Sequence, residues 1–272
     1  MFQRIGEKTS SVDSEQGFRL CAISHIGKVR ENNEDNLCFF STVLDEEHIN
    51  SKLMVSTFKD QNQSFCVGLF DGLGGEAYGE KASYLAACTM RECIKKGMDE
   101  PVSFLKDICL SMNDSVFLTA QENDYGIMGT TAALLLHHQG KMYCCNVGDS
   151  RIFGWRPDGL EQVSIDHTTA SILRELNLLD RKPQLTQYIG INEEYTWLTP
   201  AISAYSLHTF PRYLLCSDGL TDMLNEEEIH ALMAKGSVEE STKNLLEKAL
   251  ERGGKDNITI ILCERMGGPD HE

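Results

Sequence analysis

Short apolar runs that stop at turns limit what this chain can fold into. Strands are predicted at 18–26, 36–44, 64–70, 130–138, 141–147, 151–155, 160–165, 201–208, 213–216 and 258–264. Helices are predicted at 80–96, 99–121, 169–178, 229–234 and 242–252. Clustered strands joined by short turns, with helices gathered between the clusters, indicate an α+β fold with antiparallel sheets. No shift in composition divides the 272 residues. We therefore expect a loose N-terminal segment (1–17), one domain (18–264) and a C-terminal tail (265–272).

Particular residues mark the ends of several elements. Asn225 with the glutamates that follow it, and Ser237 with Glu240, have the pattern of a capping box at a helix start. Gly253-Gly254 predicts a left-handed cap at the end of the last helix. The polar segment 45–63 is interpreted as a hairpin connection or a surface insertion.

The charge balance limits the partners. The chain has 25 Lys and Arg against 41 Asp and Glu, which gives a net charge of −16. Such a surface repels nucleic acid and anionic membranes, so we expect neither as a partner. No run of 18 apolar residues is present to span a membrane. The excess carboxylates could instead hold hard cations.

The ten cysteines do not form a disulfide pattern. No Cys-x-x-Cys pair occurs, and five of the ten lie inside strand-like runs, where a free Cys acts as a small hydrophobe. Disulfide-dense scaffolds are normally short and secreted, and residues 1–17 contain no apolar segment of a secretory signal. We therefore expect reduced cysteines in a cytoplasmic protein.

Four aspartates stand at the ends of predicted strands. Asp71, Asp149 and Asp218 follow such runs, and Asp256 comes just before the last one. Each alone is explained by the tendency of Asp to form turns. If the strands share a sandwich, however, their ends can meet at one edge, where carboxylates repel one another unless cations neutralise them. Oxygen ligands alone select Mg²⁺ or Mn²⁺ rather than zinc.

Arg30 lies four residues before Glu34-Asp35. One interpretation is a solvated ion pair on the surface. Beside a divalent-metal cluster, its planar guanidinium could instead hold phosphate oxygens in a bidentate manner.

Six motifs in order carry a resemblance to a known family. They are Val29-Arg30 with Asn33-Glu34-Asp35, Phe70 to Gly75, Gly129 to Ala132, Asn146 to Arg151, Cys216 to Asp222, and Asp256 to Thr259. Together they resemble the successive motifs of the metal-dependent protein phosphatases, also called the protein phosphatase 2C family. The Asp-Gly-Leu-Gly-Gly form is most similar to the bacterial members. The motifs extend over nearly the whole of residues 18–264, and six in this order are hard to obtain by chance.

The resemblance implies a fold and an activity. The fold is a four-layer α-β-β-α sandwich of two antiparallel sheets flanked by helices. The activity is that of a protein serine/threonine phosphatase, which hydrolyses phosphoserine and phosphothreonine by attack of a metal-bridging water. The implied partners are phosphorylated proteins, the substrates of a Ser/Thr kinase, and we expect a monomer.

The resemblance also implies a site with two Mn²⁺ or Mg²⁺ ions and, in bacterial relatives, a third and weaker one. The phosphate-binding residue would be Arg30. By their positions in the motifs, Asp71 would bridge the two ions, Asp218 and Asp256 would complete one, Glu34 and the carbonyl of Gly72 would serve the other, Asp149 would hold the third together with Asp218, and Asp35 and Asn257 would orient metal-bound waters.

Three features depart from the family pattern. Leu73 stands where many members have the histidine assigned as general acid, so the leaving oxygen must take its proton from a metal-bound water or another residue. The segment 166–200, which includes the flap that shapes substrate access, fits the family least. The connection 45–63 is longer than expected for a compact member.

Three other interpretations remain open. Residues 72–77 fit the Gly-x-Gly-x-x-Ala pattern of a dinucleotide-binding turn. A catalytically inactive relative could use the same fold as a sensor or scaffold. A general metallophosphoesterase would need histidines beside the aspartates, and none of the eight histidines has a matching position; His167 after Asp166 is interpreted as part of a turn.

Overall fold

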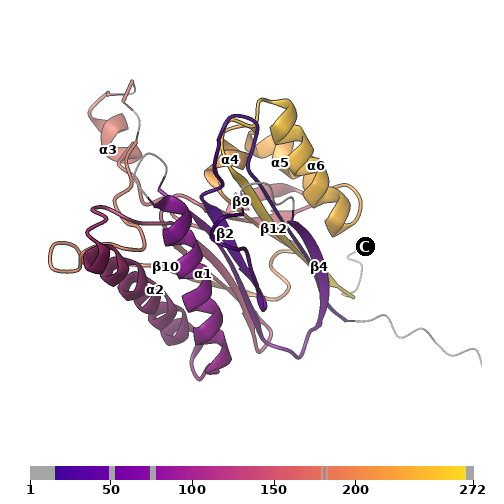
Figure 1. The fold of residues 1–272 in the computed structure, drawn as a ribbon. Helices are drawn as coiled ribbons and strands as arrows, with labels where there is room; N and C mark the ends of the chain where they lie inside the picture. Colours follow the sequence, from indigo (N-terminus) through magenta and orange to yellow (C-terminus); the bar gives the residue numbers. More distant parts are fainter. Residues whose placement is uncertain (1–15, 49–52, 74–77, 179, 182, 268–272) are drawn as a thin grey trace, which may run out of the picture.

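The computed structural model describes residues 16–48, 53–73, 78–178, 180–181 and 183–267. Two antiparallel sheets of six strands each form the centre of the fold (Figure 1). The first has the order β4 (Leu53–Asp60), β1 (Gly17–His25), β12 (Ile258–Met266), β11 (Arg212–Cys216), β8 (Arg151–Arg156) and β9 (Gly159–Gln162). The second has the order β10 (Ala201–Ser206), β7 (Lys141–Val147), β6 (Ala132–His138), β5 (Phe65–Asp71), β2 (Asp35–Phe39) and β3 (Thr42–Val43).

Helices cover the outer face of each sheet. The second sheet carries α1 (Gly79–Lys95) and α2 (Pro101–Asn123), and the first carries α4 (Asp218–Thr221), α5 (Glu226–Met233) and α6 (Val238–Glu251). The short helix α3 (Ala170–Glu175) projects away from both layers (Figure 1). The predicted α+β sandwich with four layers is confirmed.

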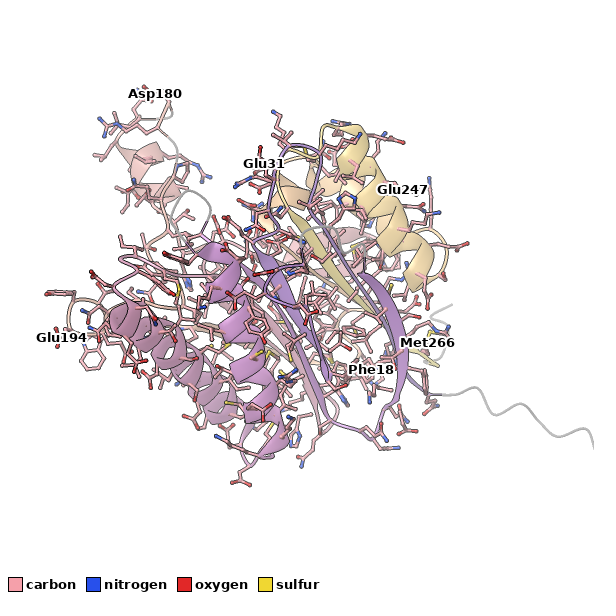
Figure 2. All side chains as sticks on the ribbon, in the orientation of Figure 1. Phe18, Glu31, Asp180, Glu194, Glu247 and Met266 are labelled. Carbon is pink, nitrogen blue, oxygen red and sulfur yellow. The ribbon has the colours of Figure 1, made fainter. Side chains whose placement is uncertain are left out.

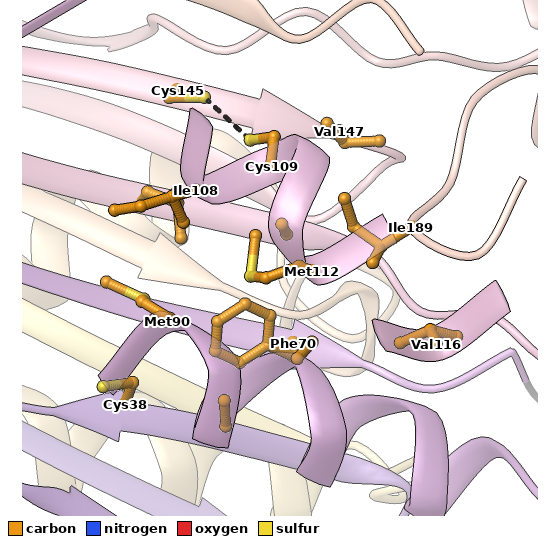
Figure 3. Packing of buried hydrophobic residues seen from close by; sticks show 14 of the residues in the cluster. Cys38, Phe70, Met90, Ile108, Cys109, Met112, Val116, Cys145, Val147 and Ile189 are labelled. Carbon is orange, nitrogen blue, oxygen red and sulfur yellow. Dashed lines mark hydrogen bonds between the residues drawn. The ribbon is translucent and has the colours of Figure 1, made fainter. Parts of the chain in front are cut away.

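Three buried layers of side chains hold these sheets and helices together. In β5, Val67 and Leu69 face the other sheet, whereas Cys66 and Phe70 face α1 and α2. Figure 3 shows Phe70 with Met112 of α2 in the layer under the helices. Side chains alternate across a strand, so a strand covered on both faces needs an unbroken apolar run, as the sequence of β5 has. A third layer, which includes Leu214, lies between the first sheet and the helices on it.

The structure differs from the predicted elements in segment 45–63. Part of that segment forms β4, which pairs with β1 from Gly17 opposite Asp60 to Ser24 opposite Leu53. β4 lies at the edge of its sheet. A half-exposed edge strand can carry polar residues, and these polar residues gave the segment the sequence pattern of a loop. Both capping boxes are confirmed, and they start α5 and α6 at Glu226 and Val238, several residues before the predicted starts. The strand β12 continues to Met266 (Figure 2), past residue 264, where the domain was expected to end.

Candidate active site

The strand ends that carry the four aspartates come together at one edge of the sandwich. Asp71 closes β5 in the second sheet, and Asp35 at the start of β2 lies opposite it in the register of the pair. Asp218 follows β11 as the first residue of α4, and Asp256 lies just before β12 in the first sheet. Asp149 lies in the connection between β7 and β8, which crosses from one sheet to the other. Both sheets therefore supply carboxylates to the same edge.

Two glycines allow the segments at this edge to approach closely. A Cβ on Gly219 would overlap the carbonyl oxygen of Asn257, so Asp218-Gly219 packs against Asp256-Asn257. A Cβ on Gly72 would overlap the carbonyl oxygen of Gly79 at the start of α1. The N–H of Gly72 also donates to the carbonyl of Glu34 at 3.1 Å. These contacts place Glu34 beside Asp71-Gly72.

A cleft opens between these segments. Asp71, Asp149 and Asp218 line it, together with Thr131 and Leu73, and Gly72, Pro183 and Leu185 complete its wall. Pro183 and Leu185 belong to segment 166–200, so the predicted flap segment does border the cleft. Leu73 presents a hydrocarbon side chain to the cleft and cannot donate a proton there.

The carboxylates in the cleft are poorly solvated and repel one another. Burial raises the pKa of Asp71 well above its usual value, and the charges of Asp35, Asp218, Asp149 and Asp256 add to this rise. Burial raises the pKa of Asp218 to about 7, with further repulsion from Asp149 and Asp256. Burial also raises the pKa of Asp149. Ionised together at neutral pH, these groups need positive charge beside them.

Arg30 supplies some of that charge at the rim of the site. Its Nη2 lies 2.8 Å from Oδ2 of Asp256, and its Nη1 lies 3.8 Å from Oε2 of Glu34. The side chain of Arg30 is 37% exposed, so the guanidinium borders both solvent and the acidic residues. Both sequence interpretations of Arg30 thus remain compatible with its position: it forms an ion pair, and it stands where it could hold an anion.

Asn257 and Asp35 support the site from behind. The amide of Asn257 accepts from the N–H of Glu34 at 2.8 Å and donates to the carbonyls of Ile26 and Asn32, each at 2.9 Å. Oδ2 of Asp35 accepts from the hydroxyl of Ser217 at 2.8 Å. The other oxygen of Asp35 is buried and makes no hydrogen bond within the part of the chain that the structure describes.

The donor set fits hard divalent cations. Among the described residues no group of three or more His, Cys, Asp or Glu side chains is arranged to hold a metal ion as it stands. The donors at this edge are nonetheless all oxygens, the set that Mg²⁺ and Mn²⁺ prefer. The buried, mutually repelling carboxylates of Asp71 and Asp218 and the buried oxygen of Asp35 that has no hydrogen bond among the described residues fit a site that binds cations.

Sequence reasoning assigned no role to several residues that position the aspartates. The Thr131 hydroxyl accepts from the N–H of Asp71 at 3.0 Å and lies 2.7 Å from the hydroxyl of Ser150. Thr131 belongs to the motif Gly129 to Ala132, and its place in that motif could have pointed to a role in the site. His167 is a second case: its N–H donates to the carbonyl of Gly148 at 3.0 Å, and its Nδ1 accepts from the N–H of Gly148 at 3.2 Å. It therefore holds the residue just before Asp149 and is more than part of a turn.

Comparison with known proteins identifies the class. Residues 54–256 match the family model described as Protein phosphatase 2C. Since the match covers most of the chain, the chain belongs to the protein phosphatase 2C family and is a phosphoprotein phosphatase. The resemblance that the six motifs indicated is confirmed.

Individual relatives are bacterial serine/threonine phosphatases. The serine/threonine phosphatase stp of Listeria innocua is 29% identical over 257 residues, which cover 88% of this chain and 92% of that protein. The crystal structure of Stp1 from Staphylococcus aureus has a TM-score of 0.76 at 26% identity and covers 98% of this chain and 100% of that chain. The catalytic domain of PstP in complex with two manganese ions has a TM-score of 0.74 at 26% identity and covers 92% and 99%.

The dinucleotide interpretation does not agree with the fold. Residues 74–77 of that motif lie outside the described residues. All strand pairs in the two described sheets are antiparallel, whereas a dinucleotide-binding fold needs parallel strands joined through helices. In the described ranges, no helix has the length and apolar content that crossing a membrane requires.

Proposed function

We propose that residues 18–264 form one serine/threonine phosphatase domain that holds two Mn²⁺ or Mg²⁺ ions in the acidic cleft and dephosphorylates phosphoserine and phosphothreonine in proteins. The observation that carries this proposal is the gathering of carboxylates from both sheets at one edge, with the pKa values of Asp71 and Asp218 raised. Bound cations would offset the repulsion between these groups and let them stay ionised together at neutral pH.

Each acidic residue has a place in this proposal. By the family resemblance, Asp71 at the end of β5 would be a ligand shared by both ions. Asp218 and Asp256, held together by the contact at Gly219, would be ligands of one ion. Glu34 and the carbonyl of Gly72 would be ligands of the other.

The remaining residues would act around this pair of ions. Asp149 lines the same cleft as Asp218 and would hold a third, weaker ion with it. Asp35 and Asn257 would orient the ligands and coordinated water.

The ions, when bound, supply an acidified water as nucleophile and positive charge for the phosphoryl oxygens. Arg30 contributes a second, fixed positive charge at the entrance, where it captures the phosphate dianion and stabilises charge on its oxygens during transfer. In the structure its guanidinium is paired with Asp256 and Glu34. Phosphate would compete for the same donors.

Leu73 has a consequence for the leaving group. When the phosphorus–oxygen bond breaks, the serine or threonine oxygen leaves as an alkoxide and must gain a proton. Since Leu73 lines the cleft and has no proton to give, that proton comes from water or another residue. Aryl phosphates, whose leaving groups need no protonation, should therefore be hydrolysed faster than alkyl phosphates, and Leu73→His should narrow that difference.

The substrates proposed for this site are phosphoproteins made by a Ser/Thr kinase, and the enzyme is proposed to act as a cytoplasmic monomer. The acidic chain, with a net charge of −16, would repel phosphoproteins at long range. Local positive charge is therefore needed where substrates approach, and Arg30 is one such group.

The test is hydrolysis of p-nitrophenyl phosphate and of a phosphothreonine peptide, each with Mn²⁺ and with EDTA. We expect turnover with Mn²⁺ that Asp218→Asn removes and that Asp114→Asn, a change of the same kind on the exposed face of α2, leaves intact. A folded protein that hydrolyses neither substrate with Mn²⁺ would favour the alternative of a binding scaffold over an enzyme.

A further inference from the structure

A second surface lies at the end of β5 that is remote from the cleft. The strand runs from Phe65 to Asp71, and at 3.3 Å per residue its two ends are about 20 Å apart. Two adjoining pockets beside Phe65 share Ser64, Phe65, Cys66 and Ile94, and so form one groove. Neither pocket contains a residue assigned to the active site.

One half of this groove is apolar. Met98 and Phe104, in and after the connection between α1 and α2, line it together with Ile94 and Leu136. Leu136 is part of the core under the helices, and Ile94, Met98 and Phe104 pack against that core. The floor of the groove is thus fixed in place and can receive an apolar side chain.

The other half is cationic. Lys59 on β4 and Arg91 and Lys95 on α1 line it, in a protein whose net charge is −16. The Lys95 side chain is 61% exposed and the Arg91 side chain 33%. One carboxylate lies among them: Oε1 of Glu92 is 2.7 Å from Nζ of Lys95 and 3.5 Å from Nε of Arg91. An exposed pair of this kind contributes little stability and can be exchanged for another anion.

The donors of Arg91 are weakly paired. Its Nε is buried and lies 3.5 Å from Oε1 of Glu92, without a well-formed hydrogen bond within the described ranges. Its Nη2 makes a long contact of 3.8 Å with the sulfur of Cys88. A carboxylate that enters the groove could pair more closely with this guanidinium than Glu92 does.

The turn after β2 adds an aromatic face to the cationic half. Phe40 has a φ of 59°, a conformation that is uncommon for a residue with a side chain. Its ring lies in the groove wall, with Nζ of Lys59 4.5 Å from the ring centroid. The strained turn therefore places an apolar surface directly beside a cation.

We propose that this groove docks an acidic segment of the phosphoprotein substrate that carries an apolar anchor; this rests on the proposed phosphatase function. The segment's carboxylates pair with Arg91, Lys95 and Lys59, and its apolar side chain enters the half lined by Met98 and Phe104. The argument for this occupant is charge complementarity: an acidic segment would be repelled by most of the protein and attracted here.

The distance between the groove and the cleft sets the minimum number of residues between the docking segment and the phosphorylated residue. Spanning about 20 Å takes at least six extended residues at about 3.3 Å each, and a path over the surface takes more. The docking segment should therefore act only when about eight or more residues separate it from the phosphorylated residue. A shorter spacer should give no advantage.

The test compares phosphothreonine peptides with a tail of Glu, Asp and Phe, with the same tail lacking Phe, with a Lys-rich tail, or with no tail. The acidic tail with Phe should lower KM about tenfold, the gain expected from a few exposed ion pairs and one partly buried side chain. The double variant Arg91→Gln/Lys95→Gln should lose that gain, whereas Glu92→Gln should enlarge it. Lys106→Gln, an exposed lysine on α2 outside the groove, is the matched control.

Hydrolysis of p-nitrophenyl phosphate separates this proposal from the proposed function, because this substrate is too small to contact the groove while its phosphate is in the cleft. Its rate of hydrolysis should be the same in the wild-type protein, in the two groove variants and in the Lys106→Gln control. Normal hydrolysis of that substrate with equal KM for tailed and untailed peptides would overturn the docking proposal alone. A gain that needs the acidic residues but not Phe, or that survives in the Arg91/Lys95 double variant, would also overturn it.

Discussion

Replacing Asp35 with Asn tests the electrostatics of the cleft without removing a proposed metal ligand. The side chain of Asp35 is 1% exposed, and one of its two oxygens has no hydrogen bond within the described ranges. Burial raises the pKa of this carboxyl to about 7, against the lowering effect of the hydroxyls of Thr259 and Ser217. Keeping Asp35 ionised in the folded protein therefore costs free energy when no cation is bound.

The free energy of unfolding depends on pH because the folded and unfolded chains bind different numbers of protons. In the unfolded chain an Asp has a pKa of about 3.9. Between roughly pH 4 and pH 7 the folded protein thus holds a proton that the unfolded chain has lost, so the free energy of unfolding falls as the pH rises. A difference of roughly three pKa units corresponds to about 4 kcal/mol. This is an upper value, since Glu34 and Asp256 interact with the same group and linked groups do not titrate independently.

Asp35→Asn keeps the shape of the side chain but cannot ionise. In metal-free buffer its free energy of unfolding should exceed that of the wild type by at most about 1 kcal/mol at pH 4.5 and by about 2–4 kcal/mol at pH 8. Urea unfolding in EDTA at several pH values measures this difference, with Asp114→Asn as the control. A difference that stays constant with pH, or an Asn variant that is less stable at pH 8, would refute the reasoning.

The remaining predictions concern metal, phosphate and the flap. Asp71→Asn should lower Mn²⁺-dependent turnover by more than roughly 100-fold, since changes to residues that only orient metal ligands typically cost 10–100-fold. The melting temperature of this variant in EDTA should not fall, and retained turnover would contradict the proposed role of Asp71. Arg30→Ala should raise KM for phosphopeptide about tenfold or more, because a charged hydrogen bond is lost, and an unchanged KM would count against it. Mn²⁺ at about 100 times its Kd should stabilise the protein by about 2.7 kcal/mol over the EDTA-treated form, and equal melting would oppose a metal site. His167→Phe should weaken Mn²⁺ activation, whereas His167→Asn, which can place an acceptor near the position of Nδ1, should preserve it; equal behaviour of both variants would exclude a positioning role.

Local sequence patterns were sufficient to predict antiparallel sheets and acidic residues at strand ends, and the family resemblance added the four layers. Asp71, Asp149, Asp218 and Asp256 could be found because each adjoins a continuous apolar run, and such runs are what strands buried on both faces require. An apolar run and a turn residue can both be recognised from a few neighbouring positions, and each of these aspartates lies between such features. The strand β4 was missed for the opposite reason: its pairing with β1 is a long-range property, and its sequence is that of an exposed edge.

Contacts between distant segments were beyond local reasoning. No spacing in the sequence predicts that Arg30 lies 2.8 Å from Asp256, or that His167 holds the backbone of Gly148. The cationic groove is a similar case, since Lys59 lies on β4 of the first sheet and Arg91 on helix α1 over the second sheet, and the two meet only in the folded protein. Leu73 shows the converse, because its departure from the family pattern was visible in the sequence and the structure places it in the cleft.

The most direct test is a crystal of the protein soaked in Mn²⁺, with the anomalous signal mapped at the manganese absorption edge. The proposed function predicts two strong peaks in the cleft that share Asp71, one of them beside Asp218 and Asp256 and the other beside Glu34 and the carbonyl of Gly72. A well-ordered map with no manganese at this edge of the sandwich, or with manganese bound only elsewhere, would contradict the proposal that these carboxylates form the metal centre of the phosphatase.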